Sequence, residues 1–108
     1  SMGLRILSTW YALHPDARIE LRAAWLWYGA VSDKLAAGFQ AEIDAAIAAI
    51  AEVPERWPRG KFDTHRYIVR LFKFVIVYRV SSNDILVYAA AHGRRRPEWW
   101  AARLDGAF

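Results

Sequence analysis

The spacing of apolar residues changes near residue 54, and this change restricts the possible folds more than any other feature of the sequence. Before it, apolar side chains recur every three or four positions over residues 15–30 and 32–52, which predicts two helices. Residues 54–65 hold two prolines, a glycine and several charges, and are expected to form a loop. After the loop the period becomes two, which predicts three strands at 66–71, 74–80 and 84–92.

The residues at the ends of these segments support the same division. A strand is expected at 8–13, because it is rich in strand-forming residues and stops before Pro15, which suits the first turn of a helix. Gly29 is expected to close the first helix and Ser32 to cap the second, which Pro54 ends. So short a link between the helices favours an antiparallel helical hairpin.

These elements predict an α+β fold. The helical hairpin would pack on one face of a small, mainly antiparallel sheet made of the N-terminal strand and a C-terminal three-strand meander. The other sheet face would be left for water or a partner. We expect a single domain over residues 4–108, with residues 1–3 as a tag remnant, since the chain has 108 residues and no internal repeat.

Composition limits the classes of function. The chain has no cysteine, so it has neither disulfides nor thiolate metal ligands, and its three isolated histidines do not suggest a metal site. No apolar run approaches a membrane span and no signal peptide is apparent, so we expect a cytoplasmic protein with no membrane partner and no cofactor. Residues 1–53 carry 4 Lys/Arg and 6 Asp/Glu, whereas residues 54–108 carry 11 and 5. The basic second half is therefore expected to face an anionic partner.

The segment AAAHGRRRPEWW, residues 89–100, combines three arginines with two tryptophans. Arginine and tryptophan dominate protein-interface hot spots, although the same groups could also bind phosphates and stack bases, or form a solvated turn. Three further arginines, Arg66, Arg70 and Arg79, interrupt the apolar strands and would add to a basic patch on the uncovered face of the sheet. The residues expected to bind a target or nucleic acid are Arg70, Arg79, Arg94, Arg95, Arg96, Trp99 and Trp100.

Several segments, in this order and spacing, resemble the RelE/ParE superfamily of toxins from type II toxin–antitoxin pairs. The similarity is closest to the ParE-like, plasmid stabilisation protein branch and spans roughly residues 8–103. The segments that carry it are HPDARIEL (14–21), WY (27–28), EIDAAIAAIAEVPERWP (42–58), FKFVIVYRV (72–80) and DILVYAAAHGRRRPEWW (84–100).

This resemblance implies a growth-arresting toxin that a cognate antitoxin neutralises. ParE-like members act on DNA gyrase, whereas RelE-like members cleave mRNA on the ribosome. Antitoxins of this group lay a C-terminal segment along the toxin and bind their operator, so operator DNA would be contacted only through the antitoxin. Leu26 and Trp27 lie off the main helical stripe and are expected to contact the antitoxin.

The catalytic residues of a RelE-like nuclease are only partly matched. Arg70 and Arg94 fall where such enzymes keep phosphate-binding arginines. His92 could transfer a proton, although we favour a strand-end histidine bonded to the backbone, because the sequence shows no proton-transfer partner for it. Trp99 and Trp100 stand where such enzymes often present a tyrosine or histidine. We therefore expect a gyrase-binding toxin that is not an enzyme. The alternatives are a ribosome-dependent endoribonuclease and a non-toxic scaffold or basic RNA-binding module.

Overall fold

The computed structural model describes residues 3–6, 9–82, 84–93 and 95–105. Two helices follow the first two strands, and three further strands follow the helices. Short 3₁₀ turns lie at 54–56, 61–63, 70–72 and 101–105. The elements in chain order are β1 (Gly3–Ile6), β2 (Thr9–Leu13), α1 (Pro15–Val31), α2 (Asp33–Glu52), β3 (His65–Val69), β4 (Phe74–Ser81) and β5 (Asp84–His92).

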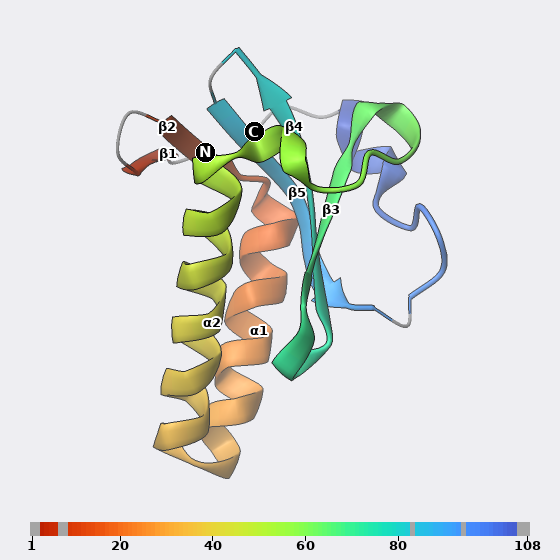
Figure 1. Cartoon of the computed structure of the whole chain (residues 1–108). Coiled ribbons are helices and arrows are strands. Elements are labelled where there is room, and N and C mark those ends of the chain that lie inside the picture. The colour runs from red at the N-terminus through yellow and green to blue at the C-terminus, as the bar shows by residue number, and fades with distance from the viewer. Residues whose placement is uncertain (1–2, 7–8, 83, 94, 106–108) are drawn as a thin grey trace.

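The strands form one mixed sheet in the order β1-β2-β5-β4-β3. Strand β2 pairs in parallel with β5, and the other neighbours are antiparallel. Helices α1 and α2 form an antiparallel hairpin that covers one face of the sheet (Figure 1). The α+β class, the helical hairpin and the C-terminal meander are thus confirmed.

Three boundaries differ from the expectation. Strand β1 was missed, and it begins at Gly3, within the residues we set aside as a tag remnant. Helix α1 continues past Gly29, which lies inside the helix beside Ala36, and runs to Val31. The helix ends where the backbone N–H of Ser32 bonds to the Tyr28 carbonyl. Strand β3 stops at Val69, where the chain enters a tight 3₁₀ turn that ends in a left-handed residue, Lys73.

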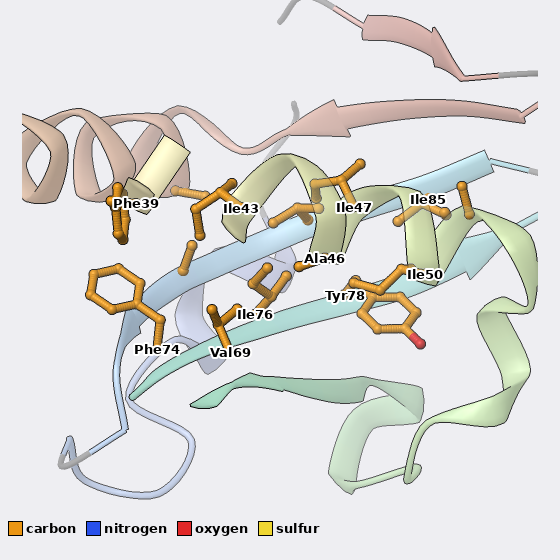
Figure 2. Close-up of a cluster of buried hydrophobic side chains, with 14 residues drawn as sticks. Phe39, Ile43, Ala46, Ile47, Ile50, Val69, Phe74, Ile76, Tyr78 and Ile85 are labelled. Carbon is orange, nitrogen blue, oxygen red and sulfur yellow. The ribbon is translucent and has the colours of Figure 1, made fainter. Parts of the chain in front are cut away.

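The larger core lies between the helical hairpin and the sheet. Phe39, Ile43, Ile47 and Ile50 recur at helical spacing along α2 and are all buried. They pack against residues that alternate along the strands, and Figure 2 shows the two sets facing each other. The strand residues of this core are Val69, Phe74, Ile76, Tyr78, Ile85, Val87 and Ala90.

A second, smaller core covers the opposite face of the sheet, which corrects the expectation that this face stays open. Buried Val77 of β4 and Ala89 of β5 pack with Trp100 of the C-terminal tail, and Trp99 and Leu104 lie beside them. The tail folds back over the side of the sheet away from the helices (Figure 1). The physical reason is that β4 is apolar on both faces, so both require cover.

Candidate functional site

The loop that leaves β5 carries exposed arginines to one end of the sheet. Arg95 and Arg96 are exposed, and Arg94 lies outside the residues that the structure describes. Arg95 and Arg96, together with Arg66 of β3 and His92 of β5, line a pocket of about 170 Å³, which we call the tail pocket. Two of the arginines expected to bind a target thus meet at one site, joined by Arg66, which the sequence analysis had assigned only to a general basic patch.

Two guanidinium groups lie against the indole of Trp99. The Cζ atom of Arg95 is 4.1 Å from the ring centroid and that of Arg103 is 4.7 Å from it. Stacking of this kind is a cation–π interaction, favoured by the electron-rich face of the ring. Trp99 is half-buried, and of these two cationic neighbours only Arg95 is exposed.

The second guanidinium is held in place by a nearly buried ion pair. Arg103 Nη2 donates to Glu20 Oε2 at 2.8 Å, and Nη1 donates to Glu20 Oε1 at 2.9 Å and to the Tyr88 carbonyl at 3.0 Å. Glu20 Oε1 also accepts from the backbone N–H of Ala90 at 3.1 Å. This bidentate contact fastens the tail to α1 and β5, and so holds in place one of the guanidiniums that contact Trp99.

Trp100 does not share the exposure of its neighbour. Only 5% of its surface is accessible, because it packs against Val77 and Ala89. The ring of Phe62 meets it edge-on at 6.2 Å. Trp100 therefore belongs to the second core and offers no surface for a partner.

Arg79 is engaged within the chain as well. Its Nε and Nη2 atoms donate to the Phe62 carbonyl at 2.8 and 2.6 Å, and its guanidinium lies 5.8 Å from the Tyr88 ring centroid. Phe62 has a positive φ of 62°, which is uncommon for an aromatic residue, so these bonds hold the 61–63 turn in its conformation. The position of Arg79 is explained by this structural role.

The candidate nuclease residues do not meet in one pocket. Arg70 is exposed in the turn after β3 and lines a groove of about 610 Å³ between α2, β3 and the loop at Trp57. His92 lines the tail pocket and an apolar hollow formed with Trp27, Tyr28 and Phe74. The described residues therefore hold no pocket that combines the Arg70 guanidinium with the His92 imidazole.

An exposed apolar surface lies on α1. Leu26 and Trp27 are 50% and 66% exposed, and Ile19, Trp25 and Val31 are exposed as well. Trp25 shares the helical spacing of Leu21, Ala24 and Tyr28, which pack against the core. Trp25 instead lines a groove between α1 and α2. Exposed apolar side chains gathered on one helix are typical of a surface that a partner covers.

A buried tyrosine anchors the loop between α2 and β3. The Tyr78 hydroxyl donates to the Pro54 carbonyl, and its ring stacks on that of His65 with centroids 5.1 Å apart. His65 in turn contacts the Trp57 carbonyl through Nδ1 and the Glu55 carboxylate through Nε2. Burial, and secondarily the negative charge of Glu55, raises the pKa of Tyr78. Burial likewise raises the pKa of Tyr11, with a smaller contribution from Asp44.

Some of these contacts carry a signal in the sequence and some do not. Arg66 alternates with inward-facing strand residues, so its side of the sheet follows from the period of two. The pairing of Glu20 with Arg103 joins residues far apart in the chain, and no local pattern announces it. Within the described ranges no group of three or more His, Asp or Glu side chains could hold a metal ion, and no helix is long and apolar enough to cross a membrane.

Comparison with known families gave one assignment. The model of the family described as the ParE toxin of the type II toxin–antitoxin system, parDE, matches residues 11–97. This region runs from β2 through both helices and the meander into the basic loop. No curated protein matched the sequence.

Proposed function

Since this chain belongs to the ParE toxin family of type II toxin–antitoxin systems, we propose that it arrests growth by binding DNA gyrase and that a cognate antitoxin neutralises it. Both partners would be met in the cytoplasm. The family match supports the toxin role. The exposed side chains of the loop after β5, Arg95 and Arg96 beside Trp99, suggest how the target is held.

The observation that carries the choice of binding over catalysis is the state of the groups that a nuclease would need. Arg70 and His92 line different pockets, Trp99 is in contact with two guanidiniums, and Trp100 is buried. General acid–base cleavage requires a proton-transfer group within reach of the phosphate that the cations hold. A protein contact requires only exposed arginines beside a rigid aromatic side chain, as at Arg95, Arg96 and Trp99.

The antitoxin would cover the apolar surface of α1. Leu26 and Trp27 project into solvent, and an amphipathic segment laid along the helix would bury them. Contact with operator DNA would come through the antitoxin alone.

Expression of the chain without its antitoxin tests the toxin role, and we expect growth arrest. With purified protein, gyrase supercoiling should be inhibited, while mRNA on programmed ribosomes should stay intact. Replacing Arg95 and Arg96 by alanine should weaken gyrase inhibition at least tenfold. The matched control is Arg22→Ala with Lys34→Ala, which removes two exposed charges from the helices instead.

Two results would contradict this function. Ribosome-dependent cleavage that disappears in His92→Ala would show the RelE-like endoribonuclease. Normal growth at high expression would instead favour a non-toxic scaffold or RNA-binding module.

The antitoxin surface has its own test. Leu26→Asp with Trp27→Asp should leave toxicity unchanged but prevent rescue by the antitoxin encoded beside the toxin gene. The control is Leu71→Asp, which places a charge at an exposed apolar position in the turn after β3. Rescue that is as complete with the α1 variant as with the control would rule out α1 as the antitoxin surface.

A further inference from the structure

A groove beside the edge strand β3 holds two opposite charges that the described residues leave unpaired. It has a volume of about 610 Å³ and lies between α2, β3 and the loop that joins them, and we call it the β3 groove. The Glu42 carboxylate of α2 and the Arg70 guanidinium of the turn after β3 both line it. Neither side chain makes an ion pair with any residue that the structure describes, whereas Arg59 in the same groove is paired with Glu55 and Asp63.

Both unpaired charges lie toward one end of the β3 groove. Helix α2 and strand β3 run in opposite directions and are joined by the loop that carries Trp57 (Figure 1). From Glu42 to the end of α2 at Glu52 the helix rises about 15 Å. Arg70 follows β3, along which the chain advances about 16 Å from His65. The carboxylate and the guanidinium are therefore on the same side of the groove, away from Trp57.

The rest of the β3 groove is mostly apolar. Ala45 and Ala46 lie one turn beyond Glu42 along α2 and line it. At the far end the Trp57 ring meets the Tyr67 ring edge-on, with centroids 4.7 Å apart. The indole N–H of Trp57 is buried without an acceptor among the described residues, which costs free energy and marks this wall as one that a bound group can stabilise. Small and aromatic walls of this kind suit a flat apolar group.

From this arrangement we propose that the β3 groove binds a free α-amino acid with an aromatic side chain. Arg70 would hold the carboxylate through its planar fork, Glu42 would accept from the ammonium group, and the ring would lie along the apolar wall toward Trp57. An acid without an amine would be repelled by Glu42, and an amine without an acid by Arg70. A peptide separates its two charged termini, so a free amino acid is the class that presents both charges at one end. This site is independent of the proposed gyrase and antitoxin contacts, because it uses none of their residues.

Nuclear magnetic resonance of the ¹⁵N-labelled full chain tests the proposal, with L-phenylalanine as the probe. The indole N–H signal of Trp57, identified by its absence in Trp57→Phe, should shift and saturate at millimolar phenylalanine. Glycine lacks the ring, phenylpropionate lacks the ammonium group and phenethylamine lacks the carboxylate. Each of these three compounds should bind about tenfold more weakly than phenylalanine, because each loses one of the three contacts.

Two charge variants assign the contacts of the head group. Glu42→Gln should weaken phenylalanine binding about tenfold without weakening phenylpropionate, because that compound has no ammonium group to lose. Arg70→Gln should likewise weaken phenylalanine without weakening phenethylamine. The matched controls are Glu52→Gln, which removes an exposed carboxylate from the end of the same helix, and Arg22→Gln, which removes an exposed guanidinium from α1.

Three results would overturn the proposal. The first is a Trp57 signal that stays in place at about 10 mM phenylalanine, since binding would then be weaker than millimolar. The second is phenylpropionate or phenethylamine binding as tightly as phenylalanine. The third is the two charge variants binding phenylalanine as tightly as their controls do. The dispersion of the amide signals in each spectrum verifies that the variant is folded.

Discussion

The arginines of this chain differ by what surrounds them. Arg79 and Arg103 are bound to carbonyl or carboxylate oxygens and hold the tail and the 61–63 turn in place. Arg95 and Arg96 make no such bonds to the described residues and face solvent beside the tail pocket. Substitution of the first pair should therefore affect folding, and substitution of the second pair should affect binding.

The Glu20–Arg103 pair provides the first test. Both side chains are mostly buried, at 13% and 16% exposure, so removal of Arg103 leaves the Glu20 carboxylate without its cation. Arg103 itself has a second, longer contact with Asp16 at 3.6 Å. Arg103→Met should lower the free energy of unfolding by about 3 kcal/mol. The double variant with Glu20→Met should recover at least half of the loss, because no buried charge remains. Urea denaturation of the unaltered protein, Arg103→Met, Glu20→Met and the double variant measures the coupling energy between the two side chains. Additive losses would show that the pair does not act as a unit.

Tyr78 should make stability depend on pH under alkaline conditions. Burial raises its pKa in the folded protein above the ordinary value of 10.0. Above pH 10 the unfolded chain therefore releases a proton that the folded chain keeps, so stability is fully present below this pH and falls above it. The contribution of this residue has a slope of up to about 1.4 kcal/mol per pH unit.

Tyr78→Phe should remove that part of the slope, which urea denaturation between pH 9 and 11 would measure. The variant should also lose about 1 kcal/mol at neutral pH, because the hydrogen bond to the Pro54 carbonyl is absent. A remaining slope in the same direction is expected from Tyr11, whose pKa burial also raises. An unchanged slope in Tyr78→Phe would contradict the assignment.

Each of the elements depends on short local features at its ends. The two helices are joined by a single residue, Ser32, which ends α1 through its backbone N–H and begins α2 through its side chain. Its Oγ accepts from the Leu35 N–H at 3.0 Å, which satisfies one of the free donors of the first turn. The tight link is what holds the helices antiparallel over the sheet.

Ser32→Ala should therefore lower the free energy of unfolding by about 1 kcal/mol. Ser32→Asp is the matched variant, because its carboxylate can accept the same bond and favours the positive end of the helix. Thermal unfolding followed by circular dichroism would measure both. Equal losses in the two variants would show that the cap contributes nothing and that the backbone alone sets the link.

Strand β3 lies at one edge of the sheet. The preceding loop partly covers the outward backbone of this strand. The Arg66 N–H donates to the Pro58 carbonyl at 3.2 Å, and the backbone of Arg59 forms an isolated antiparallel β-bridge with that of His65. Exposed edges invite pairing with other chains, and a loop folded over the edge reduces that risk. The same loop closes the groove that Arg70 lines.

The whole molecule, over its described residues, has two cores, one on each face of a single sheet. The helices supply the larger core and the C-terminal tail supplies the smaller one through Trp100. The tail thus contributes to stability through Trp100 and also positions the exposed Arg95 and Arg96 beside Trp99. These two roles explain why Trp100 is buried while the adjacent Trp99 is only half-buried.

Trp100→Ala should lower the free energy of unfolding by about 3–5 kcal/mol, because it leaves a cavity against Val77 and Ala89. Trp27→Ala is the matched control, since that side chain is 66% exposed and its loss should change stability by about 0.5 kcal/mol or less. Chemical denaturation of both variants provides the comparison. Similar losses would mean that the tail packs loosely and that the second core contributes little.

Family membership could be recognised before the structure, whereas the candidate site could be only partly anticipated. The order of segments from residue 8 onward pointed to the family that the comparison then matched. For the site, the sequence indicated that Arg95, Arg96 and Trp99 lie close together, because they are neighbours in the chain. It did not indicate that Arg66 joins them or that Trp100 turns inward.

Apolar spacing by itself determined the helical hairpin and the meander, because the repeat of a helix or a strand is a local property that burial imposes on the sequence. Composition alone likewise determined that the second half is basic. The parallel pairing of β2 with β5, the contact between Glu20 and Arg103, and the tail's cover over the second face were decided only by the tertiary structure. These contacts join residues far apart in the chain, and their formation depends on how the whole chain folds back, which no short window of sequence records.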